Sequence, residues 1–320
     1  MLRGSLSLDL DNEWSYLKTR GDARWETLPT FLEAVVARSL TLLDRHALRM
    51  TVFVVGQDAE RPENAAAFAM LARSRHEIGN HSFHHEPWLP RYSREDILTE
   101  LSRAQRAIEA ATGRRPVGFR APGYAISPAI LDVLAELGFA YDCSSLPTFI
   151  GPLARTYYFM STKMPREERK IREALYGTWS DAIKPLRPHA LHFGDRELIQ
   201  IPVTTFPGLR IPFHFSYILY LCGYSTALGL RYFELALDAC RMAKIEPSLL
   251  LHPLDFLDVG DVPSLAFFPA MAMQATKKIG ILDRALELFA KRFAVDSVGE
   301  HARTHGAAIA PLSLETVTVA

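Results

Sequence analysis

Apolar and polar positions along the chain follow two different periods. From residue 6 to 11, leucines alternate with Ser7, Asp9 and Asp11, which is the period-two pattern of a short strand with an acidic end. The apolar run 50–55 (MTVFVV) predicts a second strand of the kind buried in a parallel sheet. Residues 94–112 have the longer period of an amphipathic helix, which Gly113 ends.

The same two patterns alternate through most of the chain. Helices are predicted over 27–45, 63–74, 94–112, 128–137 and around 277–291, and further strands over 76–80, 116–119, 139–143, 198–201 and 248–251. Strands that alternate with helices are joined by helical crossovers, so the fold class is α/β with parallel strands, in an open sheet or a closed barrel.

One region interrupts this alternation. Residues 146–197 contain several prolines and a charged helical piece at 165–176 (PREERKIREALY), and we interpret them as a helical and irregular elaboration after the fifth strand. The chain is therefore expected to form a single domain over 1–300, followed by a disordered tail at 301–320.

Composition excludes some classes of function. The 320 residues include 36 basic and 36 acidic side chains, and this balance gives no reason to expect nucleic acid as a partner. The three cysteines have no C-x-x-C spacing, which predicts reduced thiols and no thiolate metal site. The N-terminus has no pattern of a secretory signal. A cytoplasmic location is therefore expected.

Two apolar stretches stand out because they carry no Lys, Arg, Asp or Glu. Residues 211–230 are rich in aromatic side chains, and residues 263–273 (PSLAFFPAMAM) are similarly apolar. Neither reaches the roughly 18 uninterrupted apolar residues of a spanning helix. Residues 211–230 are either a buried core helix or a surface that contacts a membrane or a lipid-linked substrate.

Polar residues that suggest chemistry follow the predicted strands. Asp9 and Asp11 end the first strand two residues apart, so they point to the same face. Two close carboxylates repel unless a cation or proton intervenes, and a metal beside one of them and an arginine beside the other would satisfy both. The alternative is a turn that Asp11 and Asn12 merely cap.

His81 and His85 follow the third strand in GNHSFHHE. A spacing of four places two imidazoles on one side of a helical turn, where they can hold one metal ion, although the segment is also simply rich in histidine. With Asp11 they would leave coordination positions open, as in a catalytic metal site. Zinc is the default metal, and cobalt, nickel, manganese or iron would also fit these ligands.

Three further residues come after later strands. Arg120 ends the fourth strand, and at a barrel rim it needs an acidic partner, for which Asp9 is the obvious candidate. The alternative is that Arg120 forms a purely structural ion pair. Gly123 lets a backbone N–H approach a substrate closely. His252 follows the strand at 248–251, where it is either a structural polar residue or an acid catalyst. Its ring could be held by one of three acids: Asp142, Asp255 or Asp258.

Five segments resemble the motifs of the polysaccharide deacetylase family, which includes chitin, chitooligosaccharide and peptidoglycan deacetylases. They are SLDLDNEW (7–14), HSFHH (81–85), FRAPGY (119–124), YDCSS (141–145) and LLLHP (249–253), in the family's order. Two segments depart from the usual motifs. The first has D-L-D in place of adjacent aspartates, like the cytoplasmic and allantoinase-like branch, and no Trp follows Asp142.

The resemblance implies a distorted (β/α) barrel with about seven parallel strands, a divalent metal, and hydrolysis of an N-acetyl or related amide on a sugar. It also implies a role for each residue of the site: Asp9 as general base, Asp11, His81 and His85 as metal ligands, Arg120 as the residue that fixes Asp9, Gly123 as the backbone donor to the oxyanion, and His252 as general acid.

The function expected on this basis is removal of an acetyl or formyl group from the nitrogen of an amino sugar. The uncharged segments favour a lipid-linked precursor as substrate. The alternatives are an amidase of a cyclic ureide such as allantoin and a non-catalytic glycan- or lipid-binding scaffold. An iron oxygenase also uses two histidines and a carboxylate, but it draws two of them from one H-x-D/E segment on a β-sandwich, which this alternating chain lacks.

Overall fold

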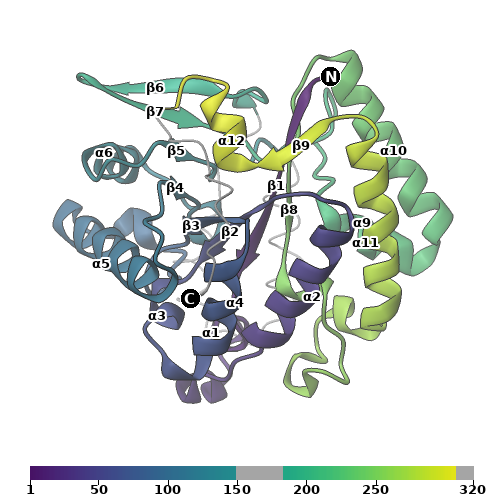
Figure 1. Cartoon of the computed structure of the whole chain (residues 1–320), viewed down its shortest axis with the longest axis horizontal. Coiled ribbons are helices and arrows are strands. Elements are labelled where there is room, and N and C mark those ends of the chain that lie inside the picture. The colour runs from purple at the N-terminus through teal and green to yellow at the C-terminus, as the bar shows by residue number, and fades with distance from the viewer. Residues whose placement is uncertain (149–182, 308–320) are drawn as a thin grey trace, which may run out of the picture.

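A curved, nine-stranded sheet runs through the computed structural model, which describes residues 1–148 and 183–307 (Figure 1). The strands lie in the order β6-β7-β5-β4-β3-β2-β1-β8, with β9 beside β1, and only the β6–β7 pair is antiparallel. Their bounds are β1 (Arg3–Leu10), β2 (Thr51–Val54), β3 (Glu77–Asn80), β4 (Gly118–Phe119), β5 (Tyr141–Asp142), β6 (His189–Phe193), β7 (Arg196–Gln200), β8 (Ser248–Leu251) and β9 (Ala294–Ser297).

The chain after β7 draws the two ends of the sheet together. The Val203 N–H donates to the Ser145 carbonyl at 2.8 Å, and the Thr204 N–H donates to the Ser248 carbonyl at 3.0 Å. Ser248, the first residue of β8, donates its own N–H to the Thr204 hydroxyl at 2.8 Å. These bonds connect the β5 side of the sheet to β8, and the predicted distorted (β/α) barrel is confirmed.

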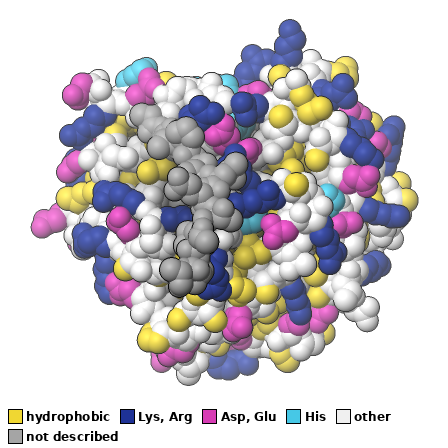
Figure 2. Space-filling view, in the orientation of Figure 1, with side chains coloured by type: hydrophobic (Ala, Val, Ile, Leu, Met, Phe, Trp, Pro, Cys, Tyr) yellow, Lys and Arg dark blue, Asp and Glu magenta, His cyan; other side chains and the backbone are white. Residues whose placement is uncertain are grey.

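Helices cover the outside of the sheet, with α5 and α6 at the left of Figure 1 and α10 and α11 at the right. The helices are α1 (Glu13–Arg20), α2 (Leu32–Arg45), α3 (Gly56–Ala59), α4 (Ala65–Arg73), α5 (Arg94–Thr112), α6 (Pro128–Glu136), α9 (Phe215–Tyr224), α10 (Thr226–Met242), α11 (Ala275–Ala290) and α12 (Val298–Arg303). On the face seen in Figure 2, basic and acidic side chains are interspersed, in keeping with the balanced composition.

The alternation in β1 separates an apolar face from a polar face. Leu6, Leu8 and Leu10 are at most 1% exposed and belong to the main hydrophobic cluster, where each contributes about 1.5–3 kcal/mol by burial. Ser7 and Asp9 point to the other side, where the guanidinium of Arg120 reaches both. The period-two pattern thus places polar groups inside the barrel and leucines against the helices.

Several predicted elements have the expected bounds, and others differ. Helix α5 and strand β8 begin and end at the predicted residues. The helix predicted over 27–45 is wrong at its start, since Thr27 ends a 3-10 helix, η1 (Ala23–Thr27), and α2 begins at Leu32. Leu28 has a left-handed backbone (φ 49°), which stops helical continuation before Pro29.

Some structure was not predicted. Helices α1, α3 and α12, strands β6 and β9, and most of helix α10 are additional elements. The expected tail from residue 301 overlaps α12, where His301 and Ala302 are 1% and 0% exposed, so the fold continues past the expected domain end. The charged helical piece at 165–176 lies outside the described residues.

The apolar stretch 211–230 forms two elements where one helix was considered. Helix α9 ends before Ser225, whose side chain accepts a hydrogen bond from the backbone of the first turn of α10. Phe215 of α9 is buried, whereas Tyr220 and Tyr224 are 50% and 78% exposed. In residues 1–148 and 183–307, each helix is too short or too polar to cross a membrane.

Candidate metal centre

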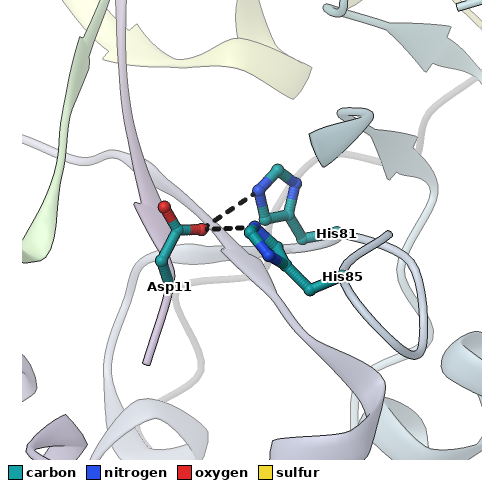
Figure 3. Close-up of side chains that lie close together, drawn as sticks. All are labelled: Asp11, His81 and His85. Carbon is teal, nitrogen blue, oxygen red and sulfur yellow. Dashed lines mark ion pairs between the residues drawn. The ribbon is translucent and has the colours of Figure 1, made fainter. Parts of the chain in front are cut away.

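Three side chains converge where β1 and β3 end (Figure 3). Asp11 directly follows β1, and the loop after β3 carries His81 and His85. The Asp11 Oδ1 atom lies 3.3 Å from His81 Nε2 and 2.9 Å from His85 Nε2. One ligand atom from each residue lies within 4.8 Å of the other two, which is compatible with a single bound cation.

The backbone of residues 81–85 is a loop, so the interpretation of their spacing as a helical turn is wrong. Ser82 and His85 have left-handed backbones, with φ of 62° and 54°. The Asn80 side chain accepts the Ser82 N–H at 2.8 Å, and the Ser82 hydroxyl accepts the His85 N–H at 3.1 Å. These local hydrogen bonds stabilise a turn that a helix would not allow.

The other two histidines of this region are engaged elsewhere. Glu100 of α5 accepts the His84 backbone N–H at 2.7 Å, and its second oxygen lies 2.7 Å from His84 Nδ1. His76 Nδ1 accepts the Met50 N–H at 3.1 Å. Only His81 and His85 of this group therefore face Asp11.

Neighbouring groups orient the two imidazoles. His81 Nδ1 lies 2.7 Å from the Arg120 carbonyl, to which it donates, and this leaves Nε2 to face Asp11. The ring of His85 meets the indole of Trp14 edge to face at 6.3 Å. Trp14 is itself fixed, because its Nε1–H donates to Asp58 at 2.9 Å.

The chemistry of this cluster fits a divalent cation. Asp11 Oδ1 is buried and has no hydrogen-bond partner among the described residues, although two imidazole nitrogens approach it. Burial would raise the pKa of Asp11, but the two neighbouring histidines lower it well below its usual range. An ionised carboxylate and two imidazoles are suitable ligands for zinc and related first-row metals.

A buried ion pair involves Asp9, which is two residues before Asp11 in the chain. Arg120, which is 0% exposed, donates from Nη1 to Asp9 Oδ1 at 2.6 Å and to the Ser7 hydroxyl at 2.8 Å. Its Nε donates to the Cys143 carbonyl at 3.1 Å. Burial would lower the pKa of Arg120, but Asp9 raises it above its usual value. The guanidinium is therefore a fixed cation that orients the Asp9 carboxylate.

The chain after Arg120 turns sharply at Gly123 and Tyr124, with φ of 59° and 60°. The Gly123 N–H lies in the first turn of η4 (Pro122–Tyr124), where an amide has no helical partner. The Tyr124 hydroxyl is buried, with no hydrogen-bond partner in the described part of the chain. Burial, assisted by the charge of Asp9, raises the Tyr124 pKa well above its ordinary value. Sequence reasoning did not single out this hydroxyl.

His252 lies at the end of β8 and begins the 3-10 helix η6 (Pro253–Asp255). Its Nδ1 lies 2.9 Å from the hydroxyl of Ser216 on α9. Ser216 also hydrogen-bonds the Asp255 carboxylate, and Asp255 accepts the His252 backbone N–H at 2.8 Å. The ring of His252 is thus held through Ser216, a residue that sequence reasoning missed.

The three acids considered for His252 have different positions. Asp142 accepts from the Ser144 N–H at 3.1 Å and from Gln200 at 3.0 Å. Asp258 accepts backbone N–H groups of Gly260 and Ala275. Of these three acids, Asp255 is the one that contacts His252. Burial raises the pKa of Asp255, and its hydrogen bonds and the charge of His252 oppose this effect.

A groove of about 510 Å³ lies between α9 and the segment before α11. Tyr220 and Tyr224 line it from α9, Met273 lines it from the second apolar stretch, and Lys277 adds a positive charge. The fold therefore brings together the two uncharged stretches noted in the sequence. Ser216, which contacts His252, is on the same helix as the two tyrosines.

Comparisons with known proteins point to one family. Residues 22–141 match the model of the polysaccharide deacetylase family, a range that contains His81, His85 and Arg120 but neither Asp11 nor His252. The chain is 35% identical to a peptidoglycan deacetylase-like protein of Gibberella zeae over 131 residues, which are 39% of this chain and 36% of that protein. It is 35% identical to a chitooligosaccharide deacetylase of Azorhizobium caulinodans over 98 residues, which are 30% and 45% of the two chains.

The match to these curated relatives spans less than half of their length. A comparison with a solved structure shows that the similarity of fold covers nearly the whole chain. A protein described as a polysaccharide deacetylase from Mycobacterium smegmatis superposes with a TM-score of 0.61 at 20% identity, over 94% of this chain and 90% of that one. The resemblance to the polysaccharide deacetylase family is confirmed, together with the barrel fold.

Proposed function

We propose that this chain, which resembles the polysaccharide deacetylase family over residues 22–141, hydrolyses an N-acyl amide on an amino sugar. One observation carries the proposal. The Asp11 Oδ1 atom, which both His81 and His85 approach, is buried without a hydrogen bond. Three protein ligands leave coordination positions open, as catalytic metal sites do. Zinc is the expected metal, and cobalt, nickel, manganese or iron would suit the same donors.

A metal held by Asp11, His81 and His85 would polarise the amide carbonyl and lower the pKa of water in the site. Asp9, fixed by Arg120, accepts a proton as that water attacks the carbonyl carbon. The Gly123 N–H and the Tyr124 hydroxyl are donors available to the oxygen that becomes negatively charged.

His252 supplies the last proton. An amine leaves a tetrahedral carbon very poorly unless its nitrogen is protonated, so an acid must act as the C–N bond breaks. Ser216 restrains the His252 ring through Nδ1, which leaves Nε2 to donate to the departing nitrogen. The products are a carboxylate, acetate or formate, and a free amino group on the sugar.

Substitution of Asp11 and Asp9 tests the proposal, because it separates metal binding from proton transfer. Asp11→Asn removes the anionic ligand, so metal content and activity are expected to fall together. Asp9→Asn is expected to retain the metal and to lower kcat by about 10²–10⁴-fold, the usual contribution of a general base. Elemental mass spectrometry measures the metal bound per chain. Activity is measured as the release of acetate from chitooligosaccharides.

His84→Gln is the matched control, since His84 is in the same loop but contacts Glu100. It is expected to keep both metal and activity. Full metal content in Asp11→Asn would contradict the assignment of the ligands. Hydrolysis of allantoin without release of acetate or formate from any amino sugar would favour the alternative amidase.

We further propose that the substrate carries an apolar chain, as a lipid-linked precursor does. The groove between α9 and α11 supports this, because Tyr220, Tyr224 and Met273 offer apolar surface beside Lys277, whose charge suits a phosphate. Helix α9 links the groove to His252, since it contributes both Ser216, which contacts His252, and the two tyrosines.

Alkyl glycosides of N-acetylglucosamine test the apolar groove. Tyr224→Ser is expected to raise KM for a long-chain alkyl glycoside by about tenfold, as burial of part of a large apolar side chain is worth about 1.5 kcal/mol. KM for the sugar without an alkyl chain is expected to stay constant. Met242→Ser is the control, because Met242 is 86% exposed on α10 and does not line the groove. Equal KM values for both substrates in Tyr224→Ser would exclude this role.

A further inference from the structure

A second cluster of metal-ligand type lies at the opposite end of the barrel. Glu246, two residues before β8, faces His301 of α12 and His305 just after it. The Glu246 Oε2 atom lies 3.3 Å from His301 Nε2 and 2.7 Å from His305 Nε2. Among residues 1–148 and 183–307, this cluster and Asp11–His81–His85 are the two groups of such residues close enough to hold one ion.

The second cluster repeats the geometry of the first. In both, one carboxylate oxygen is shared by the Nε2 atoms of two histidines four residues apart. In both, a neighbour holds Nδ1 of the more buried ring: the Arg120 carbonyl holds His81 at 2.7 Å, and the Ser5 hydroxyl holds His301 at 2.9 Å. Such a contact at Nδ1 is what fixes the ring of a metal-bound histidine.

The site is accessible from one side and rigid on the other. His301 is 1% exposed, whereas the side chain of His305 is 34% exposed and gives an ion access from solvent. The other carboxylate oxygen of Glu246 accepts the Arg3 N–H at 3.0 Å, which fixes Oε2 toward the imidazoles. The nearby Arg3 guanidinium faces Glu300 at 4.0 Å.

We infer that Glu246, His301 and His305 form a second divalent metal site, which takes zinc or a related first-row ion and is independent of the candidate catalytic centre. Ser5 is on β1, six residues before Asp11, which directly follows that strand, so about 20 Å separates the two clusters at 3.3 Å per residue. Two imidazoles and a carboxylate suit Zn²⁺, Co²⁺ or Ni²⁺. The ion would connect the end of the described chain to the start of β8 and stabilise the packing of α12 on the barrel.

Zinc stoichiometry of the full chain without a histidine tag tests the inference. After treatment with a chelator, the wild-type chain is incubated with Zn²⁺ and desalted, and bound zinc is measured per chain. About two equivalents are expected, one for each cluster. His305→Ala is expected to bind about one equivalent with unchanged hydrolytic activity, and His85→Ala about one equivalent with loss of activity. The double variant is expected to bind none.

Two further variants keep the result interpretable. His192→Ala is the matched control, because His192 is an exposed histidine that also faces a glutamate, Glu197 at 3.8 Å, but belongs to no three-residue cluster among the described residues. It should retain two equivalents. Glu246→Gln preserves the size of the side chain and should bind one equivalent even if His305→Ala folds poorly. One equivalent in the wild type, or two in both His305→Ala and Glu246→Gln, would overturn the inference.

Thermal unfolding gives an independent measurement. Addition of Zn²⁺ to the His85→Ala chain is expected to raise its Tm, because an ion that binds only the folded state stabilises it. The rise should disappear in the double variant His85→Ala and His305→Ala. An equal rise in both would show that zinc stabilises the chain elsewhere.

Discussion

Ser216 is the side chain on which the orientation of the His252 ring depends. Its hydroxyl lies between His252 Nδ1 and the Asp255 carboxylate, and Asp255 also accepts the His252 backbone N–H. A serine thus stands between the histidine and the acid. Because the hydroxyl can accept from the ring while it donates to the carboxylate, the three groups form one hydrogen-bonded chain.

Ser216→Ala removes that connection and is expected to lower kcat by about tenfold with little change in KM, because the acid acts as the C–N bond breaks and contributes little to substrate binding. Ser216→Thr keeps the hydroxyl and should restore most of the rate. Steady-state kinetics of the two variants, with Tm as a check of folding, measure the effect. A rate in Ser216→Ala equal to that of the wild type would show that His252 is positioned without Ser216.

The sequence predicts candidate site residues but not the side chains that support them. Asp9, Asp11, Arg120 and His252 could be picked out because each is a polar residue at the end of an apolar strand. Ser216 gives no such signal, since it is one hydroxyl in an aromatic helix far away in the sequence, and only tertiary packing brings it to His252.

A side chain of helix α5 holds the loop at 81–85 through hydrogen bonds. The Glu100 side chain is 5% exposed and accepts the N–H groups of Phe83 and His84 at 3.0 and 2.7 Å. Both Ser82 and His85 in that loop have left-handed backbones, which cost free energy in residues other than glycine. The carboxylate of Glu100 therefore helps to stabilise the conformation that directs His81 and His85 to Asp11.

Glu100→Ala leaves two buried N–H groups without an acceptor and is expected to weaken metal binding by about 10–100-fold, the usual effect of losing a group that supports the ligands. The dissociation constant is measured by competition with a chelating dye. Glu95→Ala, an exposed glutamate in the first turn of the same helix, should bind metal like the wild type. Identical affinities of the two variants would show that the loop holds its shape without the Glu100 carboxylate.

Elements were predictable where their local pattern is strong. Helix α5 has an apolar stripe, a serine cap and Gly113 at its end, and β8 is a buried serine followed by three buried leucines. Strand β9 (AVDS) is mostly half-buried or exposed, and among the described strands it pairs with the start of β1 alone. Strand β6 is half exposed and was missed for the same reason. Such strands form because a neighbouring strand is available to pair with them. A short local sequence pattern does not encode that pairing.

The whole molecule also depends on polar groups inside the end of the barrel opposite the candidate metal centre. Glu77 of β3 is 5% exposed and accepts from the Thr51 hydroxyl at 2.6 Å, the Tyr141 hydroxyl at 2.9 Å and the Gly299 N–H at 2.8 Å. These bonds join β2, β3, β5 and α12. His76 lies next to Glu77 and is 1% exposed, so the same end of the barrel contains a group that titrates in mild acid.

Burial lowers the pKa of His76 from 6.5 to about 4. The neutral ring is needed, because Nδ1 accepts the Met50 N–H. Below pH 6.5 the unfolded chain takes up a proton that the folded chain does not bind until about pH 4. The free energy of unfolding therefore falls as the pH drops through this window, by about 3 kcal/mol at 1.36 kcal/mol per pKa unit.

His76→Asn isolates this contribution, since the asparagine oxygen can replace Nδ1 as acceptor and does not titrate. Urea unfolding at pH 7 and pH 4.5 gives the loss of stability for each chain, and other groups that titrate in this range contribute equally to both. The wild type is expected to lose about 2–3 kcal/mol more than His76→Asn between these two pH values. Equal losses would mean that the His76 ring is protonated in the folded chain as readily as in the unfolded one.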